Sequence, residues 1–230
     1  VAGYVLARPG AVRAALEPLA AAFQFDVVES DDLLRFVPRG GAAVATIAHG
    51  DLVRAGEAAV ITETRAQDAE LPRQLTLRHI DPSRSYEPGA QHWQRPAAPS
   101  PTMRSRDAQT LDLPIVLAAD AAKATARRLL TATWRERTRF AFTGTTQHLR
   151  LEPTDPVTLV LADGSTQRGR ILSAQLGADW TLRLEALAEA AADYALTATA
   201  DGGAGYPPDA MPAPYGIRAL VPNLPLLRDG

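Results

Sequence analysis

The sequence contains no cysteine, and this absence excludes several kinds of chemistry. Within this chain there can be no disulfide bond, no thiolate nucleophile and no cysteine-ligated metal or cluster. There is also no run of about 18 apolar residues that could cross a bilayer as a helix. The formal net charge is only -2 over 230 residues, so no global field attracts nucleic acid or an anionic membrane.

Catalytic motifs are missing as well: there is no G-x-G-x-x-G, Walker loop, G-x-S-x-G or H-E-x-x-H. The four histidines lie far apart, without the paired spacing of metal ligands. His79 and Asp81 would share one face of a strand and could form a ligand pair, but a strand end and its turn explain them better. Glu29, Asp31 and Asp32 gather at a predicted hairpin turn, where acids are expected for solvation. We therefore expect no enzyme activity, no metal site and no cofactor.

The first half of the chain is expected to begin with a helix and to continue in short strands. Apolar residues recur at helical spacing over about 11–24, although Pro18 predicts a kink or a second helix start there. A hairpin is expected next, with strands at 25–29 and 33–37. The alternating pattern between 60 and 80 favours a half-buried antiparallel strand.

The second half is expected to contain a longer helix followed by antiparallel strands. The helix is predicted over about 120–138, and the strands lie between 149 and 187. Asp163 and Gly164 stand between two strand patterns and form a two-residue hairpin signal. From residue 201 onward the chain is rich in proline and glycine, which is typical of an extended connector.

The predicted fold class is α+β. We expect two small antiparallel β-barrel-like or sandwich-like units, each with a packed helix, because short strands follow one helix in each half. The first unit is predicted at 1–100, and the second, which contains the helix at about 120–138, at 101–200. Residues 201–230 are expected to connect to a following domain outside this sequence.

Aromatic residues supply candidate contact positions. Tyr86, His92 and Trp93 lie close to a proline-rich stretch and could contact a sugar, pack that loop down, or sit in an interface. Tyr206 and Tyr215 in the connector are further candidates for interface or surface contacts.

Arginines interleave with aromatics around the end of the longer predicted helix. This pattern would suit nucleic acid if the arginines formed one exposed stripe. We favour a structural explanation, in which these residues form the end of an amphipathic helix that continues into a strand. An overall acidic chain argues against nucleic-acid binding. The arginines concerned are Arg127, Arg128, Arg135 and Arg139.

Several segments resemble a known family in their amino-acid sequence and in their order along the chain. They are 12–41, 61–86, 112–130, 149–161 and 221–230. Together they resemble the hub region, a phage tail protein domain, of the multidomain baseplate megatron, the tail-tip protein of gene transfer agents and related long-tailed phages.

The resemblance implies a structural, non-enzymatic part of a tail tip or baseplate hub. Such hub regions look like the trimeric hubs of contractile tails, in which two β-barrel-type domains per subunit form a ring that adapts the tail tube to the tip. The implied partners are two further copies in a homotrimer and the neighbouring tail-tip and distal tail proteins. DNA would pass through the channel without specific binding, and the virion tail tip would be assembled in the bacterial cytoplasm.

A carbohydrate-binding or cell-wall-degrading accessory domain of the same particle is the alternative. It requires a concave patch in which Tyr86, His92, Trp93 and an acid converge.

Overall fold

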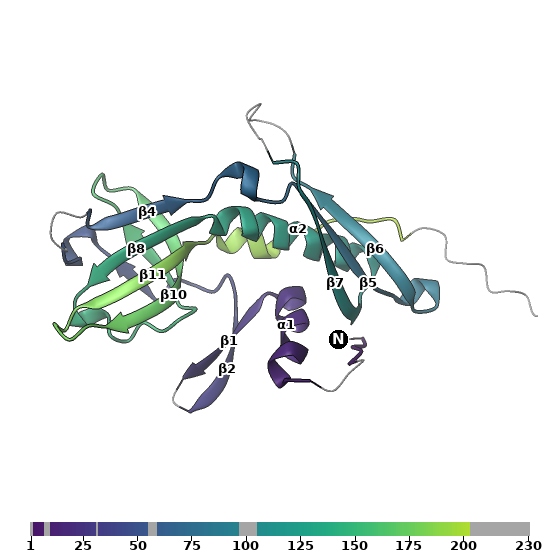
Figure 1. Cartoon of the computed structure of the whole chain (residues 1–230), viewed down its shortest axis with the longest axis horizontal. Helices are drawn as coiled ribbons and strands as arrows, with labels where there is room; N and C mark the ends of the chain where they lie inside the picture. Colours follow the sequence, from purple (N-terminus) through teal and green to yellow (C-terminus); the bar gives the residue numbers. More distant parts are fainter. Residues whose placement is uncertain (1, 7–9, 31, 55–58, 97–104, 203–230) are drawn as a thin grey trace, which may run out of the picture.

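The computed structural model describes residues 2–202, apart from 7–9, 31, 55–58 and 97–104 (Figure 1). It is a mixed α+β fold, with most strands in two sheets and two α-helices beside them. Short 3-10 helices occupy some connections: His49–Asp51, Asp68–Glu70, Pro82–Arg84, Thr146–His148 and Ala191–Ala195. No helix within the described ranges has the length and apolar character needed to span a membrane.

The larger sheet has six strands. In sheet order they are β3 (Ala45–Ile47), β9 (Pro156–Val160), β10 (Thr166–Leu176), β11 (Leu182–Ala188), β8 (Thr138–Gly144) and β4 (Ile61–Arg65). All neighbours are antiparallel except β3 and β9, which run parallel. Burial alternates along β8 and the first half of β11, so one face of the sheet builds an apolar core around Phe140, Ile171 and Leu184.

The smaller sheet has three strands in the order β6 (Glu87–Gln94), β5 (Gln74–Asp81) and β7 (Ala108–Val116). The central strand β5 is antiparallel to β6 and parallel to β7. Helix α2 (Ala119–Glu136) packs its small side chains Ala122 and Ala126 into a core with Leu77 and Ile115 of this sheet. Small residues allow the helix to lie close to the strands.

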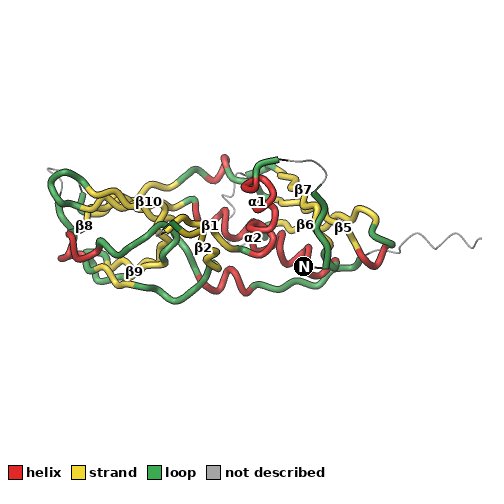
Figure 2. The backbone as a smooth tube through the Cα atoms, turned by 90° about the horizontal axis from the view of Figure 1, so that it is seen from below, coloured by secondary structure: helices red, strands yellow, loops and turns green. Residues whose placement is uncertain are grey.

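Neither sheet closes on itself in the described part of the chain: β3 and β4 end the larger sheet, and β6 and β7 end the smaller one. The expected antiparallel barrel-like units are therefore corrected to two open sheets, each of which contains one parallel pair. Both helices lie beside the smaller sheet and between the two sheets, rather than one in each unit (Figures 1 and 2).

In both sheets, strands from before residue 100 pair with strands from after it. β3 and β4 come from the first half of the chain and complete the sheet of the second half, whereas β7 comes from the second half and pairs with β5. The division into units at 1–100 and 101–200 stays a prediction, and each half depends on the other for a sheet partner. The predicted connector lies outside the described residues from 203 onward.

The first helix and the hairpin after it form where the sequence predicts them. Helix α1 (Val12–Phe23) runs through Pro18 without interruption, so no second helix starts there. The carbonyl that loses its helical donor belongs to Ala14, an exposed residue that water can hydrate. Gln24 ends α1 in the left-handed conformation, and β1 (Phe25–Ser30) and β2 (Leu33–Pro38) follow as an antiparallel hairpin that projects from the body (Figure 1).

Candidate functional site

The aromatic candidates do not converge on one patch. His92 and Trp93 are neighbours on β6, so their side chains point to opposite faces, and only Trp93 packs against the core beside α2. Tyr86 lies exposed in the turn before β6, six residues from His92, which is about 20 Å along a strand. The concave sugar patch that the carbohydrate hypothesis requires is therefore not formed by these three residues. Surface contacts by Tyr86 and His92 stay predictions, and Tyr206 and Tyr215 lie outside the described residues.

His79 and Asp81 do share one face of β5, as the strand pattern predicts, and both are almost fully buried. The Oδ1 atom of Asp81 accepts hydrogen bonds from the backbone N–H of Ser83 at 2.9 Å and from its hydroxyl at 2.7 Å. Burial alone would raise the pKa of Asp81, but these two hydrogen bonds hold it below its usual value. This carboxylate therefore shapes the turn after β5.

The imidazole of His79 is enclosed without a hydrogen-bond partner on either ring nitrogen. Gly89 lies against it, and a side chain there would come within 3.0 Å of the His79 Cε1 atom. Burial lowers the pKa of His79, although the nearby Asp81 opposes this. Over the ranges that the structure describes, no three His, Asp or Glu residues are grouped as metal ligands. We therefore assign His79 to packing of the hairpin between β5 and β6.

The arginines around the end of α2 do not form one exposed stripe. Helix α2 ends at Glu136, so Arg139 belongs to β8. Arg127 donates to a main-chain carbonyl at 2.6 Å, Arg128 donates to one at 3.3 Å, and Arg135 binds the carboxylate of Asp193 at 2.9 Å. Because these three side chains are held by contacts within the chain, the four arginines do not form the exposed stripe that nucleic-acid binding would require.

A hollow of about 600 Å³ lies beside α2, bounded by residues of both sheets. Tryptophan side chains form part of its wall, and Arg95 stacks 3.9 Å from the ring centre of Trp134, whose indole N–H donates to a main-chain carbonyl at 2.7 Å. Arg127 lies 4.8 Å from the ring of Trp93. We call this hollow the arginine groove, after the five arginines in its wall: Arg65, Arg95, Arg127, Arg135 and Arg137.

Positive charge in the arginine groove exceeds negative charge. Its wall contains only two acids, Glu63 and Asp193. Burial lowers the pKa of Arg95; the negative charge of Asp68, which pairs with Arg137, opposes this, and the positive charges of Arg135 and Arg65 lower it further. In a chain of net charge -2, the groove is a local site of positive potential.

A buried ionic cluster holds the hairpin, α2 and the larger sheet together. At its centre Arg170 of β10 is only 8% exposed. It donates to Asp26 of β1 at 2.9 Å and to Glu136 of α2 at 2.7 Å, and its Nε atom lies 3.9 Å from Glu189. A single guanidinium thus joins three segments of the chain.

Two further arginines extend this cluster. Arg39 makes a two-pronged contact with Asp26, at 3.0 and 2.6 Å, and Arg168 donates to Glu189 at 3.2 Å. We refer to these charges as the ionic junction: Asp26, Arg39, Glu136, Arg168, Arg170 and Glu189. Its three arginines balance its three acids, which lets the charges be buried together. Its residues are far apart in the sequence, 144 positions for Asp26 and Arg170, so no local pattern indicates it.

The hairpin formed by β1 and β2 is apolar on its outside and acidic at its tip. Leu33, Leu34 and Phe36 are each more than half exposed. Glu29 and Asp32 beside the turn are exposed as well. Exposed apolar side chains gathered on one projecting element are typical of an interaction site. We call this element the tip hairpin.

The described residues thus form three features: a groove with an excess of positive charge, a projecting hairpin with exposed apolar side chains, and an ionic junction that fixes this hairpin to the body. Comparison with known proteins gives the family. The model of the family described as "Putative phage tail protein" matches residues 11–174, which is more than half of the chain. The chain therefore belongs to this phage tail protein family, as the resemblance of its segments predicted.

Solved structures show the same fold. The chain is similar to a protein in the "Virion of native gene transfer agent (GTA) particle", with a TM-score of 0.72 and 24% identity over 82% of this chain and 41% of that chain. It is also similar to the 43 kDa tail protein of prophage MuSo2 from Shewanella oneidensis, with a TM-score of 0.51 and 12% identity over 82% of this chain and 57% of that chain. The chain thus spans about half, or less, of the proteins that it resembles. No curated protein matches it significantly.

Proposed function

We propose that this chain is a non-enzymatic structural module of a phage-like tail tip, the hub region of a multidomain megatron protein, in which three copies form a ring around the DNA channel. The observation that carries the proposal is the family match over residues 11–174. The fold shared with a protein of a gene transfer agent particle supports it. The surfaces of the module support it too, because a ring needs contact faces rather than a catalytic centre.

The charge of the chain suits a channel wall through which DNA slides. Protein affinity for DNA comes mostly from neutralising phosphates with lysine and arginine. Here the net charge is -2, and many arginines are paired with acids of the same chain, in the ionic junction for example. We infer that DNA passes without specific binding, and that the neighbouring partners are the other proteins of the tail tip and distal tail.

The mass of the purified chain in solution tests the proposal. Multi-angle light scattering over a range of concentrations should show a rise from one chain, 24.5 kDa, towards about three times that mass. A mass that stays at one chain at every concentration would contradict a hub that assembles through this region. A gel-shift assay with duplex DNA at low salt is the companion measurement, and we expect no shift. A strongly salt-dependent shift would overturn the inference of a passive channel wall.

A further inference from the structure

The tip hairpin carries the features of a ligand for another surface. Its base is held at Asp26 by two arginines of the ionic junction, whereas Leu33, Leu34 and Phe36 face solvent. Glu29 adds an exposed carboxylate next to these apolar side chains. The hairpin is thus an element with a fixed base, an apolar side and an acidic tip.

The arginine groove has complementary features. Its wall combines positive charge with apolar surface from Trp93, Pro96 and Leu196, each of which is at least partly exposed. Arg65 has no acidic partner among the described residues, and its side chain is exposed on β4. In the described part of the chain β4 pairs only with β8, so the other edge of β4 is open beside the groove. An acidic, apolar strand would find both charge partners and a free strand edge there.

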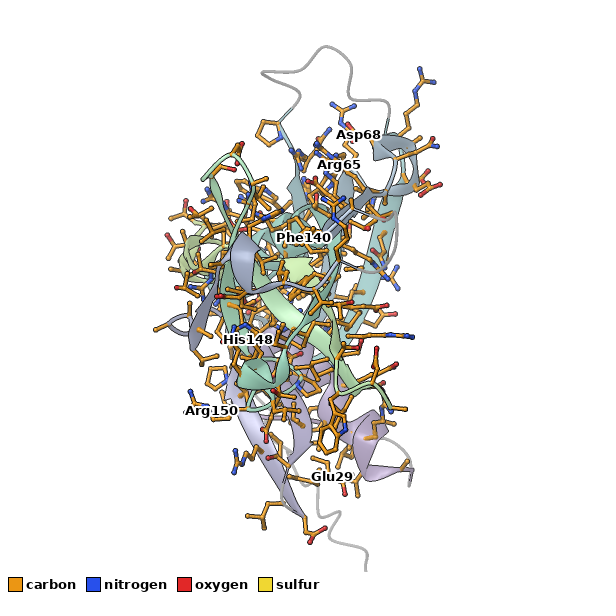
Figure 3. All side chains as sticks on the ribbon, turned by 90° about the vertical axis from the view of Figure 1, so that its left-hand side faces the viewer. Glu29, Arg65, Asp68, Phe140, His148 and Arg150 are labelled. Atoms are coloured by element: carbon orange, nitrogen blue, oxygen red, sulfur yellow. The ribbon has the colours of Figure 1, made fainter. Side chains whose placement is uncertain are left out.

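The two surfaces cannot meet within one chain. In Figure 3, Glu29 of the tip hairpin and Arg65 of the arginine groove lie at opposite ends of the view. Because the ionic junction holds the base of the hairpin to the body, the hairpin cannot swing across the molecule. A tip hairpin that enters the groove must therefore belong to a second copy of this chain.

We propose that the tip hairpin of one copy docks into the arginine groove of the next copy. Glu29 and Asp32 meet the arginines, and Leu34 and Phe36, which share one face of β2, cover the apolar wall. This contact joins two different surfaces, so each copy has one of each to offer, and such head-to-tail contacts form a ring when the rotation closes. The inference rests on the proposed assembly of several copies and names the surfaces that make the contact.

Cross-linking tests the contact directly, because a chain without cysteine gives clean single-cysteine variants. One variant carries Leu34→Cys on the tip hairpin, and the other carries Gln167→Cys in the wall of the groove. Mixed under mild oxidation, the two should form a disulfide-linked pair, whereas neither variant alone should do so. Gln175→Cys, on the same strand as Gln167 but outside the groove, is the matched control and should stay unlinked. Equal linking by Gln175→Cys, or no linking by Gln167→Cys, would overturn the proposal.

Charge reversal gives a second, independent reading. Glu29→Arg with Asp32→Arg, and separately Arg65→Glu with Arg95→Glu, should each weaken self-association about tenfold or more, and all four changes in one chain should restore it. The controls reverse the same number of exposed charges elsewhere: Asp112→Arg with Glu185→Arg, and Arg78→Glu with Arg183→Glu.

The outcomes separate this inference from the proposed hub. A trimer whose mass is unaffected by reversal, and which shows no cross-link, keeps the hub and rejects the docking. A specific cross-link in a chain that never reaches the mass of three copies keeps the docking and rejects the closed ring.

Discussion

Removing the guanidinium at the centre of the ionic junction should destabilise this chain far more than breaking an exposed ion pair. Arg170→Leu deletes the hydrogen bonds to Asp26 at 2.9 Å and to Glu136 at 2.7 Å, and it also removes the charge beside Glu189. Leucine fills part of the space, so the main loss is electrostatic. The three acids then face one another with less positive charge between them.

The expected cost follows from the two lost hydrogen bonds and the exposure of their acceptors. Hydrogen bonds to charged groups contribute about 1.5–3 kcal/mol each. Asp26 and Glu136 are 17% and 27% exposed, so water reaches both acids, and Asp26 keeps its contact with Arg39. We therefore use the low end for each bond, which gives about 3 kcal/mol, at the lower limit for breaking a buried ion pair.

Urea unfolding followed by tryptophan fluorescence measures this cost. The matched control is Arg13→Leu, which breaks an ion pair with Glu17 in which the side chains are 90% and 66% exposed, and which should change the free energy of unfolding by less than about 0.5 kcal/mol. Glu136→Gln added to Arg170→Leu should recover part of the loss, because it removes an acid that keeps only its longer contact with Arg39, at 3.6 Å. A loss of under about 1 kcal/mol for Arg170→Leu would refute the reasoning that the junction stabilises the fold.

Three other changes are expected to have measurable effects. Burial lowers the pKa of His79, so at acidic pH this imidazole is protonated in the unfolded chain before it is protonated in the folded chain. The free energy of unfolding should therefore fall as the pH drops below about 6.5. His79→Leu should reduce this pH dependence in urea titrations between about pH 7.5 and 5. Gly40→Ala places a methyl group 2.8 Å from Tyr194 at a φ of +81° and should cost about 1–3 kcal/mol in urea unfolding, whereas Gly41→Ala meets open space and should cost less. Trp134→Phe loses the bond from the indole N–H to a main-chain carbonyl and should lower the free energy of unfolding by about 1–2 kcal/mol, measured by circular dichroism in urea.

Elements with a local sequence signal were predictable. The hairpin at 25–38 shows two apolar runs around an acidic turn, and it forms with Phe25 opposite Pro38. A turn also forms at Asp163 and Gly164, with Gly164 at a φ of +79°, but its loop has three residues rather than the two predicted, because the backbone N–H of Leu161 donates to the carbonyl of Ser165 at 2.8 Å. In each case the information lies within a few neighbouring residues.

Strands β6 and β7 were not predictable, because each contains a proline that normally argues against a strand. Pro88 and Pro114 remove a backbone donor from β6 and β7 respectively. Both strands are edges of the three-stranded sheet, where a missing donor costs little, and the carbonyl of Pro114 even accepts from the backbone N–H of Val5. Edge position is a property of the assembled sheet and cannot be read from a single strand.

The candidate surfaces depended on the same long-range information. From sequence, the acids at the hairpin turn could be explained only by solvation. The arginines of the groove come from β4, from α2 and from the residues directly after β6 and α2, so they meet only in the folded chain. The ionic junction connects the tip hairpin to the body of the chain. It fixes the base of the tip hairpin through Asp26 and leaves Glu29 and Leu34 beyond it exposed. A partner that binds this hairpin therefore does not have to order it first, and such preorganisation reduces the entropic cost of binding. Loss of Arg170 should accordingly weaken self-association as well as folding, even though Arg170 itself lies in neither contact surface.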